Sequence, residues 1–184
     1  MAGTTIALGP YHRGILPCLL RWFNDFTFSI LCGDLVQPQT PEDIEAEYER
    51  CTKGPDRFDF IIYERADLRP IGIANLRDID KRHLTAEFGI GIGERDSWGK
   101  GYGTETTSLV LDFGFTALGL HNIILAPISF NERAIRAYQR AGFKEIGRRH
   151  EAYRIGNRTY DLVLMDCLAS DFKPLAKRAL ELPE

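Results

Sequence analysis

The chain has 184 residues, of which 44% are hydrophobic and 27% are charged, and these values are typical of one globular domain. At this length about two thirds of the unfolded surface can be buried, so neither disulfides nor a structural metal are needed for a stable core. The formal net charge of −3 supplies no overall field that would attract nucleic acid or an anionic membrane surface.

The first half of the chain predicts a strand, two helices and then three strands. Leu16, Leu19 and Phe23 recur at helical spacing, and the second helix opens with Pro41 followed by acids, as helix starts often do. The segment ERADLRP separates two apolar runs and indicates the turn of a hairpin. The predicted strands cover residues 4–8, 58–63, 71–76 and 83–93, and the predicted helices cover residues 15–24 and 41–50.

The second half alternates helices with strands. The clearest helix spans residues 103–118, and Gly119 follows it where a left-handed residue usually ends a helix. Another helix spans residues 132–141, with Asn131 as its N-cap and Gly142 as its stop. The predicted strands cover residues 122–125, 143–154 and 159–168, with a hairpin turn at 156–157 and a frayed helix or coil from residue 169. This order predicts the α/β class with a mixed sheet.

The strand over residues 83–93 has two very different faces. Glu87 shares one face with Gly89, Gly91 and Gly93, whereas the other face is apolar. Glycines weaken the packing of a strand, and they occur where a ligand or another backbone comes close. A strand crowded by a bulky neighbouring side chain is the alternative, and the ligand is the interpretation that we favour.

A second glycine-rich segment, WGKGYGT at residues 98–104, opens the helix of residues 103–118. Glycines let backbone amides converge at the start of a helix, where the dipole favours anions, so phosphate or pyrophosphate is the expected guest. The segment matches neither the nucleotide P-loop nor the dinucleotide fingerprint, because its glycines have the wrong spacing. A tight turn from strand to helix is the alternative.

The segment NERAIRAYQRAGF at residues 131–143 has an aromatic and a basic side. Tyr138 shares its helix face with alanines, and on its own it indicates an ordinary core aromatic. The arginines of the other side, taken alone, indicate a solvated face; they are Arg133, Arg136 and Arg140.

Together, the glycine-bearing strand, the GxG loop that opens a helix, a further strand and the pattern N-x-x-A-x-x-x-Y-x-x-x-G-F resemble the GNAT N-acetyltransferase superfamily. The polyamine and ribosomal-protein alanine acetyltransferase branches are the most similar. The resemblance implies a GNAT fold, with a central, mostly antiparallel sheet that is splayed at the cofactor cleft and flanked by helices. It also implies a single domain over residues 1–184, in which 1–80 form the acceptor side, 81–168 bind acetyl-CoA and 169–184 are a tail.

The same resemblance implies how the cofactor is bound. The loop amides would hold the pyrophosphate of acetyl-CoA, the preceding strand would pair its backbone with the pantetheine arm, and the next strand would splay away, which Pro127 fits because it cannot donate to a ladder. The family loop commonly begins with Gln or Arg, and Trp98 departs from that pattern without harm if only its backbone amide contributes. The implied positions are Ile90, Gly91, Ile92, Trp98, Gly99, Lys100, Gly101, Tyr102, Gly103, Thr104 and Asn131.

Acetyl transfer to an amine needs an unprotonated nucleophile and a proton for the leaving thiolate. The resemblance implies that Tyr138 faces the thioester sulfur, and we expect it to be the general acid. Glu87 is the carboxylate on the glycine face, and it is expected to be the base, directly or through water, with a structural hydrogen bond within the sheet as the alternative. Strand amides that polarise the thioester carbonyl would supply electrostatic stabilisation.

The expected acceptor is a small cationic amine, either a polyamine or an amino sugar. Residues 25–49 contain seven acids and neither Lys nor Arg, and the matching helices of the family line the acceptor side of the cleft. An acidic rim would concentrate a cation, with Asp25 and Asp34 as substrate-binding residues because they are predicted to lie in a loop. The alternative acceptor is a protein N-terminus, and the alternative to an acetyl group is a longer acyl group. A non-catalytic module that binds acyl-CoA is a further alternative, whereas a purely structural protein would leave both glycine segments unexplained.

Cysteine spacing and the chain ends guide the remaining expectations. Cys18, Cys32, Cys51 and Cys167 lie far apart without a CxxC pair, which argues against a zinc site and against a disulfide scaffold. We therefore expect acetyl-CoA as co-substrate and no metal. The first residues do not resemble a signal peptide, and no apolar run approaches ~18 residues. The expectation is a cytoplasmic enzyme with a small-molecule amine substrate, no nucleic-acid or membrane partner, and the homodimer that is common in the family.

Overall fold

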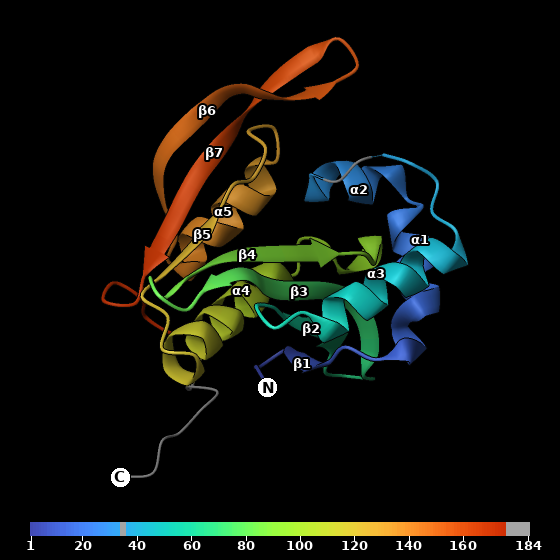
Figure 1. Cartoon of the computed structure of the whole chain (residues 1–184), viewed down its shortest axis with the longest axis horizontal. Helices are drawn as coiled ribbons and strands as arrows, with labels where there is room; N and C mark the ends of the chain where they lie inside the picture. The colour runs from blue at the N-terminus through green and yellow to red at the C-terminus, as the bar shows by residue number, and fades with distance from the viewer. Residues whose placement is uncertain (34–35, 176–184) are drawn as a thin grey trace.

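Figure 1 shows a computed structural model of the chain, which describes residues 1–33 and 36–175. Over these residues, seven strands form one sheet in the order β1-β2-β3-β4-β5-β7-β6. The strands are β1 (Ile6–Pro10), β2 (Phe58–Glu64), β3 (Arg69–Asp80), β4 (Thr85–Ile92), β5 (Asn122–Leu125), β6 (Lys144–Ile155) and β7 (Arg158–Leu168). The helices are α1 (Leu16–Phe23), α2 (Phe26–Cys32), α3 (Pro41–Lys53), α4 (Tyr102–Asp112) and α5 (Glu132–Ala141). Short helical turns cover Arg13–Ile15, Arg95–Ser97 and Phe113–Ala117.

The sheet is antiparallel except at one junction, which is the arrangement expected of the GNAT fold. β1 to β4 pair antiparallel in order, as do β5 with β7 and β7 with β6, whose hairpin reaches past the other strands in Figure 1. β4 and β5 are parallel, and they pair only where residues 85–87 meet 122–124. The chain after β5 follows β7 instead, through the carbonyl of Pro127 and a bridge between Ile128 and Leu162. The rest of β4 is therefore an open edge, and the predicted splay is confirmed.

Local capping signals set several of the helix ends where the sequence predicted them. Asn131 accepts a hydrogen bond from the N–H of Ala134 at the start of α5 (3.2 Å), and Gly142 follows α5 with a φ of +116°, a left-handed conformation that ends a helix. The helix predicted over residues 103–118 is α4 followed by one π-helical turn, and Gly119 ends it with a φ of +65°.

Helix α2 is absent from the sequence-based prediction, which places Asp25 in a loop. In the structure Asp25 is the N-cap of α2, where its carboxylate accepts from the N–H of Thr27 (3.0 Å), and Gly33 ends the helix with a φ of +79°. The sequence FTFSILC has no polar face, so it shows no helical periodicity. Phe28 is only 2% exposed and packs against the rings of α1, so tertiary burial rather than local pattern stabilises this helix.

Two buried clusters pack on opposite faces of the sheet. The larger one includes Ile62, Phe88 and Leu109 and lies beneath α4 and α5. The smaller one includes Ile61 and Trp22 and lies beneath α1, α2 and α3. Neighbouring residues of a strand point to opposite faces, so β2 contributes to both clusters and the sheet is covered on each side.

No single helix among the described residues is long and apolar enough to cross a membrane. One pair of consecutive helical segments, Arg13–Phe23 and Phe26–Cys32, reaches the required length and composition only when taken together across a bend of 96°.

Candidate active site

Two cavities meet where β4 has its open edge. The larger cavity, of about 760 Å³, is lined by α1, α2, α3, the middle of β3 and β4, and the segment after β5. The smaller, of about 200 Å³, is lined mainly by the glycine loop and α5. The residues that line both cavities define the junction, and they are Phe28, Leu31, Cys32, Ile90, Gly91, Asn131 and Tyr138. Two molecules bound in the two cavities would meet at this junction.

The backbone of β4 directs polar groups to the junction. The N–H of Gly93 donates to the carbonyl of Ile71 in β3 (2.8 Å). Backbone groups of successive residues point to alternate edges of a strand, so those of Ile90 and Ile92 face away from β3, toward the open edge. The Ile92 carbonyl accepts there from the indole N–H of Trp98 (2.8 Å). The remaining groups face an edge that has no strand partner in the described part of the chain. They are placed to bond an extended ligand or to polarise a carbonyl.

The glycines of β4 make room for neighbouring side chains. A Cβ at Gly91 would lie 2.7 Å from the ring of Phe28 and 2.9 Å from the sulfur of Cys32, and a Cβ at Gly93 would lie on the indole of Trp22. Gly91 also lines both cavities. At Gly93 the glycine is therefore explained by a bulky neighbouring side chain. At Gly91 the space beside the backbone is occupied partly by side chains of α2 and partly by the two cavities.

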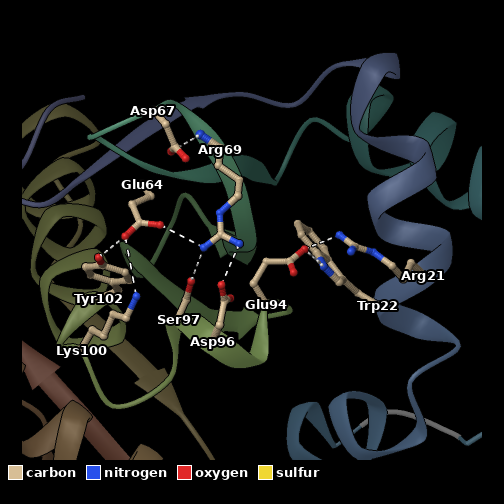
Figure 2. Close-up of polar contacts among 10 residues, drawn as sticks. All are labelled: Arg21, Trp22, Glu64, Asp67, Arg69, Glu94, Asp96, Ser97, Lys100 and Tyr102. Atoms are coloured by element: carbon tan, nitrogen blue, oxygen red, sulfur yellow. Dashed lines mark hydrogen bonds and ion pairs between the residues drawn. The ribbon is translucent and has the colours of Figure 1, made fainter.

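We expect Gly93→Ala to destabilise the fold, because the indole that the new methyl group would meet is fixed. Trp22 is 2% exposed, and its N–H donates to Glu94 (2.9 Å), as Figure 2 shows. Overpacking of this kind costs about 1–3 kcal/mol, and each kcal/mol lowers Tm by roughly 2–4 °C in a chain of this size. Thermal unfolding followed by circular dichroism measures the effect. Gly147→Ala is the matched control, since no other described atom lies within 4 Å of its added Cβ, and equal Tm values for both variants would contradict the prediction.

The loop after β4 turns its backbone toward the smaller cavity. Gly99 and Gly101 have φ values of +79° and +87°, which glycine adopts far more readily than other residues. The first helical bond of α4 runs from the N–H of Glu105 to the carbonyl of Gly101 (3.1 Å), so the amides of residues 101–104 have no helical acceptor. The residues of 98–104 other than Lys100 line the smaller cavity. The loop thus gathers N–H donors at the positive end of a helix dipole, which is the geometry of an anion site.

Side chains behind the loop form the ion-pair network of Figure 2. The guanidinium of Arg69 donates to the carboxylates of Glu64 and Asp96, at 3.0 Å each. Glu64 also accepts from the hydroxyl of Tyr102, which holds the pKa of Glu64 below its ordinary value, and the ammonium of Lys100 lies 3.9 Å from it. The side chains of Lys100 and Tyr102 thereby tie the loop to the end of β2, while the loop backbone faces the cavity.

The side chain of Trp98 takes part in the site, beyond the backbone role that the sequence allowed for. Its indole bonds to β4, and the guanidinium of Arg133 lies 4.2 Å above its rings. Arg133, Arg136 and Arg140 are exposed, as predicted, and all three also line the smaller cavity. The basic side of α5 therefore places cations beside the amide-rich loop, where a polyanionic ligand would meet them.

Tyr138 is half-buried at the junction of the cavities. Its ring packs edge-on against Phe88 and Phe143, with centroid separations of 6.2 and 6.0 Å. Burial raises the pKa of its hydroxyl well above the ordinary value of 10, so this group keeps its proton at neutral pH. Tyr138 is thus both a packed core aromatic and a residue of the cavity wall, two roles that the sequence analysis treated as alternatives.

Asn131 connects the two helices on either side of the junction. Its side-chain oxygen caps α5, and its side-chain amide donates to the carbonyl of Leu31 in α2 (3.4 Å). It also lines both cavities. A bond from Asn131 to a ligand would therefore be made in addition to the cap, or in exchange for the bond to Leu31.

Glu87 lines the larger cavity and is ion-paired with Arg77, which lies opposite it in β3. The structural bond within the sheet that the sequence offered as an alternative is therefore present. It leaves the carboxylate at the cavity wall, beside the guanidinium that balances its charge.

Asp25 and Asp34 were expected to contact the substrate. The carboxylate of Asp25 accepts two hydrogen bonds from the guanidinium of Arg95 (2.7 and 2.8 Å), and these bonds hold the pKa of this carboxyl below its ordinary value. It is not part of the wall of either cavity in the described structure. Asp34 lies outside the described residues.

Most of the acidic segment has basic partners from outside it. Arg13 pairs with both Glu45 and Glu49 on α3. Asp43 and Glu47 line the larger cavity. The cavity wall also carries three cations, Arg50, Arg57 and Arg77, so its charge is far more balanced than the sequence of residues 25–49 indicates.

Three residues at the junction were not singled out from the sequence, namely Phe28, Leu31 and Cys32 of α2. A short apolar segment carries no signal that its side chains line a site, because the same composition describes any buried helix. None of the four cysteines, all of which are described, forms a disulfide, and no group of three or more His, Cys, Asp or Glu in the described residues is arranged to hold a metal.

The splayed sheet, the amide-rich loop and the two joined cavities are the features expected of the acetyltransferase class that the sequence resembles. The family model for the acetyltransferase (GNAT) domain matches residues 9–144, and the chain belongs to this family.

Individual relatives show which enzymes of the family are similar to this chain. The spermidine N(1)-acetyltransferase of Vibrio cholerae is 34% identical over 111 residues, which are 60% of this chain and 64% of the relative. That of Escherichia coli K12 is 32% identical over 56% of this chain and 59% of its own, so these matches span less than two thirds of either relative. A crystal structure of the spermidine N-acetyltransferase of Vibrio cholerae in complex with CoA and spermine has a TM-score of 0.84 and 26% identity, and it covers 92% of this chain and 98% of the other.

Proposed function

We propose that this enzyme transfers the acetyl group of acetyl-CoA directly to a primary amine of a polyamine, within a ternary complex. The observation that carries the proposal is the meeting of the two cavities at Tyr138, beside the open edge of β4. A structural neighbour is a spermidine N-acetyltransferase in complex with CoA and spermine, which supports a CoA thioester and a polyamine as the two substrates.

Acetyl-CoA takes the smaller cavity in this proposal. The pyrophosphate lies against the amides of Gly101 to Thr104, with the arginines of α5 supplying positive charge nearby. The pantetheine arm lies along the open edge of β4, bonded by Ile90 and flanked by Asn131. The thioester then reaches the junction, where the N–H of Ile90 polarises its carbonyl.

At the junction the amine nitrogen attacks the thioester carbon, the C–S bond breaks, and the leaving sulfur takes the proton of the Tyr138 hydroxyl. A phenol protonates a thiolate readily only where their pKa values are close. Dry surroundings raise the pKa of thiols as well as phenols, and burial raises the pKa of two thiols of this protein, Cys51 and Cys167, to about 12. The sulfur beside Tyr138 is subject to the same effect.

The acceptor takes the larger cavity, where Asp43, Glu47 and Glu87 are the carboxylates of the wall. Glu87 accepts the proton that the attacking nitrogen loses, directly or through water. A free alkylamine has a pKa of about 10.4, so a base or a lowered pKa is needed for attack at neutral pH.

The charge balance of this wall favours a second acceptor class, a protein N-terminus. Arg50, Arg57 and Arg77 would tolerate the anionic groups of a peptide, which an acidic cavity would repel. A cytoplasmic location and a homodimer both stay predictions from the sequence.

The test is a panel of acceptors assayed with acetyl-CoA and a thiol-release readout. We expect spermidine or spermine to give the highest kcat/KM, ahead of glucosamine, n-butylamine and a peptide that begins with alanine. If the peptide were acetylated and none of the other amines were, the enzyme would instead resemble the ribosomal-protein branch in its choice of acceptor. Thiol release that stays at the level of acetyl-CoA in buffer with every amine would support a non-catalytic acyl-CoA-binding module.

A further inference from the structure

The wall of the larger cavity includes a polar residue, Asn75, that the catalytic proposal does not use. Asn75 lies in the middle of β3 opposite Gly89 of β4, is 7% exposed, and lines the larger cavity. Its side-chain oxygen has no hydrogen-bond partner among the described residues. Asparagine is depleted in strand interiors, and a buried acceptor without a donor is destabilising, so its presence here calls for a physical reason.

Two other buried side-chain oxygens lack partners in the described structure, those of Thr106 and Asn122. Neither residue belongs to the wall of the two cavities. Asn75 therefore differs from them in having a space beside it that a donor from outside the protein can enter.

The surroundings of Asn75 leave that space open. Gly89 has no side chain, and a Cβ there would lie 2.8 Å from the Asn75 oxygen and 3.4 Å from the guanidinium of Arg77. Arg77 is engaged with Glu87, which balances its charge. The last torsion of an asparagine side chain is soft and roughly two-fold, so a half-turn exchanges the two ends of the amide and presents the oxygen to the cavity.

We propose that Asn75 is a specificity-determining residue, whose side-chain oxygen accepts a hydrogen bond from a second nitrogen of the acceptor, one that does not react. Gly89 precedes the junction residue Gly91 by two positions, which is about 7 Å along a strand. The Asn75 oxygen therefore lies several ångströms from the position of the reacting nitrogen. An acceptor with a second nitrogen can reach across this distance, and a monoamine has no second nitrogen to do so. This inference rests on the proposed function and names the feature of the acceptor that the cavity recognises.

The experiment compares the best polyamine of the panel with the monoamine n-butylamine in two variants, Asn75→Leu and Asn75→Asp. Asn75→Leu is expected to lower kcat/KM by roughly 10- to 100-fold for the best polyamine of the panel, the size of a lost hydrogen bond to a charged group, and to leave kcat/KM for n-butylamine within about two-fold of the parent. Asn75→Asp retains an acceptor oxygen and is expected to keep the polyamine kcat/KM within a few-fold of the parent. KM for acetyl-CoA is expected to stay unchanged in both.

Thermal stability supplies the independent readout. Asn75→Leu removes an unsatisfied polar group, so its Tm is expected to equal or exceed that of the parent. Thr106→Val is the matched control, because it also removes a buried unpartnered oxygen and is expected to change no kinetic constant.

Three results would overturn the inference while the proposed function stands: an unchanged polyamine kcat/KM in Asn75→Leu, an equal loss for the monoamine, or a loss in Asn75→Asp as large as in Asn75→Leu. Failure of the parent enzyme to acetylate any amine of the panel would instead overturn the proposed function, and this inference with it.

Discussion

Tyr138→Phe is expected to lower kcat by roughly 10²–10⁴-fold, the usual contribution of general acid–base catalysis, with KM for acetyl-CoA nearly unchanged. The substitution removes one oxygen and keeps the ring packed against Phe88 and Phe143. Steady-state kinetics at saturating amine measure the effect, and isothermal titration with acetyl-CoA checks that binding persists.

The pH profile gives a second readout for Tyr138. Burial raises the pKa of this hydroxyl above its ordinary value of 10, so the acid form prevails over the whole neutral range. Deprotonation of Tyr138 is therefore expected to cause no loss of kcat below pH 10 in the parent enzyme. Tyr160→Phe is the control, since this ring packs on Phe130 and belongs to neither cavity wall in the described structure. A kcat within a few-fold of the parent in Tyr138→Phe would make Tyr138 a core residue only.

Gly103→Val is expected to abolish measurable acetyl-CoA binding while the fold survives. No other described atom lies within 4 Å of a Cβ added at Gly103, and its backbone does not have a positive φ, so the protein itself accommodates the side chain. The added atoms would occupy the space where the amides of the loop meet a phosphate. Each charge-assisted hydrogen bond lost is worth about 1.5–3 kcal/mol, or roughly 10- to 100-fold in affinity.

Isothermal titration with acetyl-CoA measures the loss, and thermal unfolding shows that the fold is intact. Gly103 is a cleaner position for this test than Gly101, whose φ of +87° makes any side chain strained. Gly147→Val is the control, because its added Cβ is equally free of described neighbours and lies on β6, away from the loop. Parent-like affinity in Gly103→Val would exclude the loop as the phosphate site.

The parts of the fold that the sequence predicted are those encoded within a few neighbouring residues. Asn131 and Gly142 bound α5 because a side-chain cap and a left-handed glycine act over one helical turn. The glycine loop was recognised for the same reason, since the φ values of Gly99 and Gly101 and the donors of a helix start are local properties. Tyr138 and the loop were then joined by a family resemblance rather than by any local rule.

The features that the sequence missed arise from contacts between distant residues. α2 forms because Phe28 is buried against α1 and β4, and no pattern within its seven residues records that burial. The acids of residues 25–49 indicated a cation-binding rim, but Arg13 and Arg95 reach them from other elements and pair with them.

By itself, then, the sequence determined the order of the strands along the chain, most helices and the glycine conformations of the loop, because periodicity, caps and glycine conformations are short-range. The tertiary structure decided the charge of the acceptor cavity, the participation of Trp98 and α2 in the site, and the unpartnered oxygen of Asn75. Ion pairing and burial depend on which residues the fold brings within a few ångströms, and those distances are set by the splayed sheet rather than by position along the chain.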